Sequence, residues 1–359
     1  MEFGRAFIDD WQTFAAAVGT DLQAVGKDRQ RNRRALAIGA ATALAVYAAL
    51  CLNLDYPMWS GMTALTVTAA TQRATVLKGL MRIAGTLAGA LAAAFLLGFV
   101  ADSNGLLATA LFATVTYALY RSFTSPYPYA WLLGGITIGL VLMQSMAEPD
   151  IGLHVAAYRA TEIIVGVVSA FAVGALLLPA TSDPEQDRAL AAAPQVERRV
   201  AMRTALEAGA GVCIVVGLYA LFDLPGFASA AVSLTRIVDP NPELGRHRAF
   251  LRLIGCAIGG GAGLLMVGTS IDVLPLFLAV IFVFCSIFGY FFAGPPACAY
   301  AGMQAGFAFI IAYAPSITPT DTLDPAIDRF AGILLAFAVF WIIDMLFTPQ
   351  HPVAATPPR

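Results

Sequence analysis

The chain has 359 residues, of which 59% are hydrophobic and only 12% are charged, and its formal net charge is −2. Soluble globular proteins carry about 25% charged residues, so this composition excludes an ordinary soluble protein and indicates an integral membrane protein. The five cysteines lie inside apolar segments without metal-ligand spacing, which favours a packing role over a metal or redox site. No Ser-His-Asp arrangement or phosphate-binding loop is present, so we expect neither an enzyme nor a cofactor.

Residues 1–34 are predicted to form a cytoplasmic amphipathic helix followed by a basic segment next to the membrane. Apolar side chains recur there at spacings of three and four, at Phe7, Trp11, Phe14, Val18, Leu22 and Val25. The opposite face is acidic, whereas a helix that binds anionic lipid usually has a basic face. We therefore expect this helix to pack on the cytoplasmic side of the protein itself or on a sister subunit, which leaves a homo-oligomer open.

Twelve apolar segments follow, and each approaches the length of about 20 residues that a membrane-spanning helix needs. In the first half they are residues 35–54, 57–71, 83–100, 106–120, 128–146 and 158–178. In the second half they are residues 204–222, 225–238, 253–270, 273–293, 296–314 and 328–348. The chain therefore divides into a membrane unit at 35–179, a cytoplasmic linker at 180–203, a second membrane unit at 204–349 and a cytoplasmic tail at 350–359.

The second unit repeats the first. The stretch from Leu77 to Gly85 matches that from His247 to Gly255, and Arg159 matches Arg329 at the same offset along the chain. Because each unit has an even number of spans, the two copies insert in the same orientation. We predict an all-α, polytopic membrane protein of about 12 transmembrane helices, built as two parallel six-helix repeats around a pseudo-two-fold axis along the membrane normal.

Basic residues predict the orientation. Clusters of Lys and Arg precede the first span, lie between the halves and follow the second and eighth spans, whereas the alternate loops hold none. By the positive-inside rule, both termini are cytoplasmic.

The second and eighth spans are short and polar, and both follow an Asp-x-Pro sequence, at Asp55 and at Asp223. Short, Pro-interrupted spans at matching places of two repeats point to a transport site. The candidate lining residues are Trp59, Thr63, Phe227, Ser229, Ser233 and Arg236. The alternative is that the hydroxyl groups satisfy one another in a packed bundle.

Two pairs of arginines recur in both copies, Arg82 with Arg252 near the cytoplasmic side and Arg159 with Arg329 near the outer side. A charge at membrane depth is costly unless it faces water or a partner, so we interpret all four as anion-binding residues of a pathway. For the outer pair, the alternatives are extension of the side chain to the lipid headgroups, or pairing with acidic neighbours, Glu162 and Asp328.

Four acidic residues are candidates for carrying a proton: Glu162, Asp344, Asp55 and Asp223. Burial raises the pKa of a carboxyl group toward neutrality. The alternative role of Asp55 and Asp223 is to cap the short helices.

The stretch from Tyr56-Pro57-Met58-Trp59 to Thr71, followed by Lys78-x-x-x-Arg82-Ile83-x-Gly85-Thr86-x-x-Gly89, resembles the fusaric acid resistance family. Arg159-Ala160-Thr161-Glu162-Ile163-Ile164-x-Gly166 is similar to it as well. The chain departs from many members, which carry a large soluble domain between their membrane halves. The resemblance implies export of organic, often aromatic, acids, sometimes with a periplasmic adaptor protein.

These observations predict a bacterial inner-membrane exporter of small organic, aromatic carboxylic acids, driven by the proton gradient. Its partners would be membrane lipids and a small organic anion, with no nucleic acid. A passive anion channel of the malate-permeable type is the rival, because the same arginines would then set its selectivity. A membrane scaffold that transports nothing is the third hypothesis, and short polar helices and paired buried charges argue against it.

Overall fold

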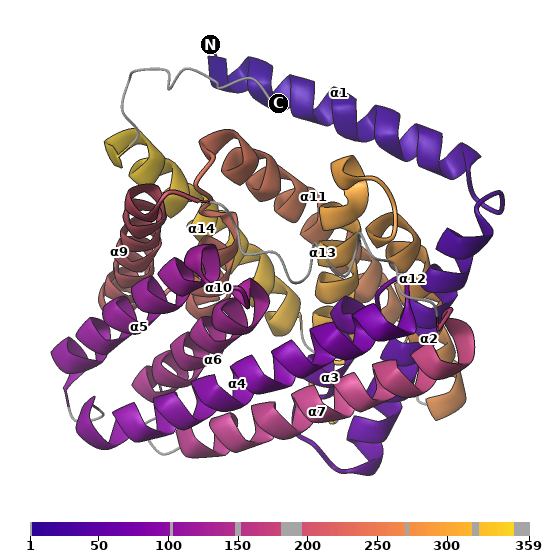
Figure 1. Cartoon of the computed structure of the whole chain (residues 1–359), viewed down its shortest axis with the longest axis horizontal. Helices are drawn as coiled ribbons and strands as arrows, with labels where there is room; N and C mark the ends of the chain where they lie inside the picture. The colour runs from indigo at the N-terminus through magenta and orange to yellow at the C-terminus, as the bar shows by residue number, and fades with distance from the viewer. Residues whose placement is uncertain are drawn as a thin grey trace.

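The computed structural model describes residues 2–100, 103–147, 152–180, 196–269, 273–317 and 323–347, and the regular structure within them is helical. An N-terminal helix, α1 (Glu2–Gln23), precedes the two halves (Figure 1). The first half contains α2 (Arg29–Cys51), α3 (Pro57–Val67), α4 (Gln72–Val100), α5 (Asn104–Thr124), α6 (Pro128–Ala147) and α7 (Gly152–Leu177). The second contains α9 (Arg198–Phe222), α10 (Phe227–Ile237), α11 (Pro242–Val267), α12 (Leu274–Phe292), α13 (Pro296–Tyr313) and α14 (Asp324–Phe347).

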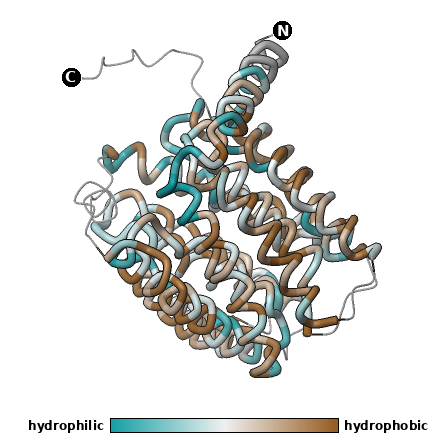
Figure 2. The backbone as a smooth tube through the Cα atoms, turned by 90° about the vertical axis from the view of Figure 1, so that its right-hand side faces the viewer, coloured by the Kyte–Doolittle hydropathy of each residue, from teal (hydrophilic) through white to brown (hydrophobic). Residues whose placement is uncertain are grey.

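Within the described residues, nine helices are long and apolar enough to cross a membrane. Figure 2 shows hydrophobic residues, in brown, through much of the helical bundle. This confirms an all-helical, multi-pass membrane protein. Each of the twelve predicted spans coincides with one helix, but α3 and α10 have only 11 residues and α13 has 18. Most of the predicted linker and the whole of the predicted tail lie outside the described residues.

The largest difference from prediction lies at the start of α4 and α11. The predicted spans began at 83 and 253, whereas the helices begin at Gln72 and Pro242. Apolar runs mark only the part of a helix that is hydrophobic all round, and these first three turns are mixed in character. Arg82 and Arg252 therefore lie inside helices, each ten residues or about 15 Å from the helix start.

The short helices begin differently from each other. Pro57 is the first residue of α3, but α10 begins at Phe227 after a tight turn in which Asp223 and Gly226 have φ of +49° and +72°. Asp223 ends α9, and no side-chain cap is formed at the start of either short helix. The proposed capping role of Asp55 and Asp223 is therefore wrong. At about 16 Å, each short helix spans roughly half of a 30 Å hydrocarbon core.

The halves contact each other through equivalent helices. The fourth helix of each half packs on the first helix of the other, α5 on α9 and α12 on α2. The short helix of each half also contacts the fifth helix of the other, α3 with α13 and α10 with α6. The two halves are thus interlocked around the short helices rather than joined by the linker alone.

Helix α1 lies along one edge of the bundle, where it contacts α11 and α13 (Figure 1). Phe14 is buried against these helices, whereas Leu22 and Val25 from the same predicted apolar face are exposed. The Asp21 carboxylate accepts two hydrogen bonds of 2.7 Å from the Arg31 guanidinium. These bonds hold the pKa of Asp21 below its usual value. Asp10 of α1 also pairs with His247 of α11 over 2.9 Å. α1 is therefore held by one apolar cluster and two ionic contacts.

Glycines let α4 and α11 approach their neighbours closely. Gly85 and Gly89 of α4 lie against the backbone of α6, and Gly255 and Gly259 of α11 lie against α13. A Cβ atom at any of the four would overlap a carbonyl oxygen, namely that of Ala130, Gly134, Ala301 or Ala305. This is the helix-packing role expected of such small-residue pairs.

Gly259→Ala is expected to destabilise the protein by about 1–3 kcal/mol, because the new methyl group forces α11 away from α13. Gly261→Ala on the same helix is the matched control, since nothing lies within 4 Å of a Cβ there. The control should be neutral or slightly stabilising. Thermal unfolding of both variants in the same detergent checks this, and equal stability would contradict the packing argument.

Candidate functional site

Arg82 lies deep in the first half, with 7% of its surface exposed. Its Nε donates to the hydroxyl of Thr63 over 3.1 Å, and Nη1 donates to the hydroxyls of Thr66 and Tyr129 over 3.3 and 3.0 Å. Helices α3, α4 and α6 thus supply the arginine and its three acceptors.

Arg252 has the same surroundings in the second half and is 3% exposed. Its Nε donates to the hydroxyl of Ser233 over 3.0 Å, and Nη1 donates to that of Tyr300 over 3.2 Å. Ser233 follows Thr63 at the same offset at which Arg252 follows Arg82. The place of Thr66 is taken by Arg236 at that offset, so the second half carries one more cation here.

Neither Arg82 nor Arg252 forms an ion pair with any of the described residues. A buried charge is costly unless it is paired, and neutral hydroxyl acceptors leave the positive charge uncompensated. The sites are therefore suited to an anion.

A cavity of about 670 Å³ lies between the halves beside these sites. Tyr129 and Tyr300 both line it, together with Arg236 and Arg248. A volume of this size is typical of a small-molecule site, and aromatic walls with a few polar groups are typical of its lining. Each tyrosine hydroxyl links the cavity to one buried arginine.

The second pair of recurring arginines, Arg159 and Arg329, is also buried but differs in its partners. The Arg159 guanidinium lies over the Trp59 ring, 4.0 Å from its centroid, a cation–π arrangement. Arg329 donates to the side-chain oxygen of Gln304 over 3.2 Å. Neither arginine forms an ion pair with any described residue, so the predicted pairing with Glu162 and Asp328 is not formed. The Nε atom of each arginine also lacks a hydrogen-bond partner among the described residues.

Glu162 is fully buried and joins α7 to the start of α3. Its Oε1 accepts a hydrogen bond of 2.9 Å from the backbone N–H of Tyr56, while its Oε2 has no partner among the described residues. In the second half Gly332 stands at the equivalent place, and there the start of α10 packs directly on α14. A carboxylate present in one copy and not at the equivalent place of the other thus lies buried beside Arg159.

Other predicted residues lie away from the cavity. The Phe227 ring stacks on Tyr219 with 3.9 Å between centroids. Ser229 packs against α14 and its carbonyl accepts from Ser233 over 2.6 Å. The Asp55 carboxylate lies 3.0 Å from the His154 ring nitrogen at the start of α7, and Asp223 is exposed at the end of α9. Asp344 is partly buried near the end of α14.

Tyr129 and Tyr300, which join the arginines to the cavity, were not predicted. Their separation along the chain differs by a single position from the offset that relates the other matched pairs, so they fall outside the register of the repeat. A search of the fifth helix that allowed this shift would have paired them.

Two family descriptions match the chain. Residues 35–209 match the Fusaric acid resistance protein family, and residues 202–343 match the Fusaric acid resistance protein-like family. The two matches meet near the boundary between the halves. No solved structure matches the chain.

Curated relatives align with less than half of the chain. The "Uncharacterized transporter YdhK" of Escherichia coli K12 is 32% identical over 155 residues, which is 42% of this chain and 23% of that protein. The "p-hydroxybenzoic acid efflux pump subunit AaeB" of Edwardsiella ictaluri is 31% identical over 169 residues, 44% of this chain and 26% of that protein. The matched stretch thus spans about a quarter of these relatives.

Glu162→Ala is expected to be less stable than Glu162→Gln by about 1–3 kcal/mol, because only glutamine keeps an acceptor for the Tyr56 N–H. Both variants remove the charge, so their difference reports the hydrogen bond together with the packing of the side-chain stem that alanine lacks. Thermal unfolding of the two side by side measures it. Equal unfolding temperatures would show that the carboxylate does not hold the start of α3.

Proposed function

Because the chain belongs to the fusaric acid resistance family, we propose that it is an inner-membrane efflux transporter for small organic anions, with aromatic carboxylates as substrates. The observation that supports this most is the pair of buried arginines held only by hydroxyl groups beside a cavity of about 670 Å³. One relative is named for the efflux of p-hydroxybenzoic acid, an aromatic carboxylate whose chemistry agrees with a cationic site walled by tyrosines.

In the proposed cycle the two termini are cytoplasmic and the cavity receives the anion from that side. Arg236 lines the cavity and meets the carboxylate first. Tyr129 and Tyr300 contact the ring, and their hydroxyls can turn from the arginines toward the substrate, since a hydroxyl both donates and accepts. Arg82 and Arg252 then hold the carboxylate with charge-assisted hydrogen bonds.

Arg159 and Arg329 form the outer end of the proposed pathway. The interlocked contacts of equivalent helices support two repeats related by a pseudo-two-fold axis along the membrane normal, and such an axis would place these two arginines opposite each other. Trp59 beneath Arg159 offers an aromatic surface on the way out. A periplasmic adaptor that continues the pathway is proposed from the description of the relative as a pump subunit.

Proton coupling is proposed to act through Glu162. Its buried position beside Arg159 and its free Oε2 support this role. Asp55 lies between α2 and α3 with its side chain 43% exposed, and Asp223 is exposed at the end of α9. Neither is buried beside an arginine, so they are weaker candidates. The alternative is a passive anion channel, which the same hydroxyl-held arginines support.

Replacing Arg82 or Arg252 with Gln is expected to lower export of p-hydroxybenzoate by about 10- to 100-fold at low substrate, because each removes a charge-assisted hydrogen bond. Arg33→Gln, at an exposed position near the start of α2, is the control and should transport normally. The measurement is uptake into inverted vesicles. Wild-type rates in both variants would exclude these arginines from the pathway.

Glu162→Gln is expected to retain the fold but to abolish the response of transport to an imposed pH gradient, since the amide cannot carry a proton. The same proteoliposomes, with and without the gradient, test both the coupling and the residue. Large anion currents without any effect of pH in the wild type would support the channel instead.

A further inference from the structure

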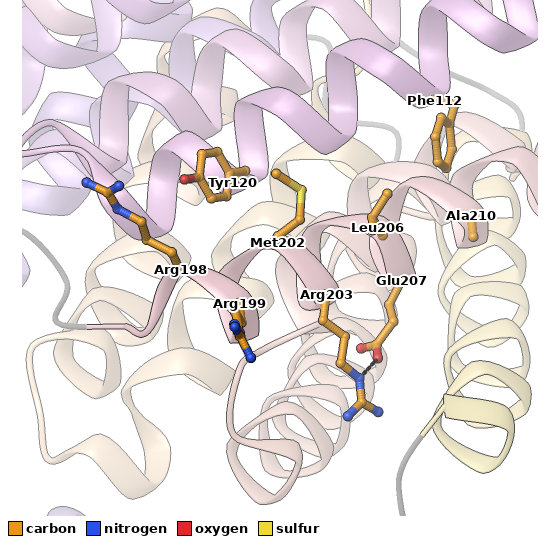
Figure 3. Close-up of a pocket in the computed structure, with 9 residues that line it drawn as sticks. All are labelled: Phe112, Tyr120, Arg198, Arg199, Met202, Arg203, Leu206, Glu207 and Ala210. Carbon is orange, nitrogen blue, oxygen red and sulfur yellow. Dashed lines mark hydrogen bonds and ion pairs between the residues drawn. The ribbon is translucent and has the colours of Figure 1, made fainter.

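A second large cavity, of about 680 Å³, lies outside the proposed pathway, between α5 and α9 (Figure 3). Tyr120 of α5 and Met202 and Leu206 of α9 form its apolar wall, and the two α9 side chains are 41% and 43% exposed. Arg198 and Arg199 stand at its end, where α9 begins. An apolar groove thus opens beside two exposed cations.

The equivalent place in the other half is already filled. Helices α2 and α12 meet there as α9 and α5 do here, and Tyr290 is the counterpart of Tyr120 at the offset of the repeat. Arg31 lies 3.8 Å over the Tyr290 ring, and the end of α1 closes the site by placing Asp21 on Arg31. The first half therefore satisfies its basic helix end with a carboxylate from its own chain.

In the second half the basic helix end is not satisfied by the described residues. Arg203 pairs with Glu207 over 2.8 Å (Figure 3), whereas Arg198 and Arg199 form no ion pair with them. A ligand that matches this groove would bring negative charge to the two arginines and apolar atoms to Met202 and Leu206. A phospholipid with an anionic headgroup has both, and its two parts are arranged in that order across a membrane surface.

We propose that this groove is a binding site for an anionic phospholipid of the cytoplasmic leaflet, with the headgroup on Arg198 and Arg199 and an acyl chain along Met202 and Leu206. The proposal rests on the cytoplasmic orientation given under Proposed function, but not on transport. The lipid would fill, in the second half, the place that α1 closes in the first.

Binding of phosphatidylglycerol to the full-length protein, without any transport substrate, tests the site. Native mass spectrometry during lipid titration should show one phosphatidylglycerol bound more tightly than phosphatidylcholine. The double variant Arg198→Gln/Arg199→Gln should weaken it by about 30-fold, two cations near an anionic surface contributing about 1 kcal/mol each. Arg29→Gln/Arg33→Gln removes the same charge at the start of α2 and should bind as the wild type does.

Ala210→Phe provides a second variant, because it fills the groove without changing charge. This variant should also lose the tightly bound phosphatidylglycerol. Inorganic phosphate should stabilise neither the wild type nor this variant, which distinguishes a lipid ligand from a free anion. Unchanged phosphatidylglycerol binding in both variants would overturn the proposal. So would stabilisation of the wild type by inorganic phosphate alone, or a dimer that the double variant dissolves, which would identify a second copy of the chain as the occupant.

Discussion

A guanidinium buried among apolar helices, without a carboxylate partner among the described residues, is the constraint on which the rest of the molecule depends. Arg82 and Arg252 satisfy it with hydroxyls from the short helix that precedes each of them and from the fifth helix of the same half. Such acceptors must be held close, and the short helices α3 and α10 and the glycines of α4 and α11 hold them there. Neutral acceptors keep the charge available, which a carboxylate would cancel. The same buried arginines therefore explain both the arrangement of these helices and the proposed transport of anions.

The two copies differ at positions beside the buried arginines. At equivalent positions the first half has Thr66, Trp59 and Glu162, and the second has Arg236, Ser229 and Gly332. The second half thus carries the extra cation, Arg236, at the cavity. At the other two positions the first half carries a carboxylate, Glu162, and an aromatic ring, Trp59. A transporter with two identical halves would offer no reason for an anion and a proton to bind at different places.

The repeat in the sequence predicted the helices and the recurring arginines, because a constant offset survives in the charged and glycine positions. It did not predict where Arg82 and Arg252 lie along their helices, since hydropathy marks only the apolar part of a helix. It paired Phe227 with Trp59 through the Asp-x-Pro sequences, but the longer turn at Asp223 shifts the second helix by two residues. Partners brought together from separate helices, such as Glu162 with the Tyr56 N–H, have no signature in local sequence.

The most direct measurement is the position of a bound anion. A structure of the full-length protein with 4-iodobenzoate, located by the anomalous signal of iodine, would show it. The account predicts the carboxylate beside Arg236 and within hydrogen-bond distance of Arg82 or Arg252, with the ring between Tyr129 and Tyr300 in the cavity between the halves. An iodobenzoate bound elsewhere, with these arginines still held only by their hydroxyl partners, would contradict it.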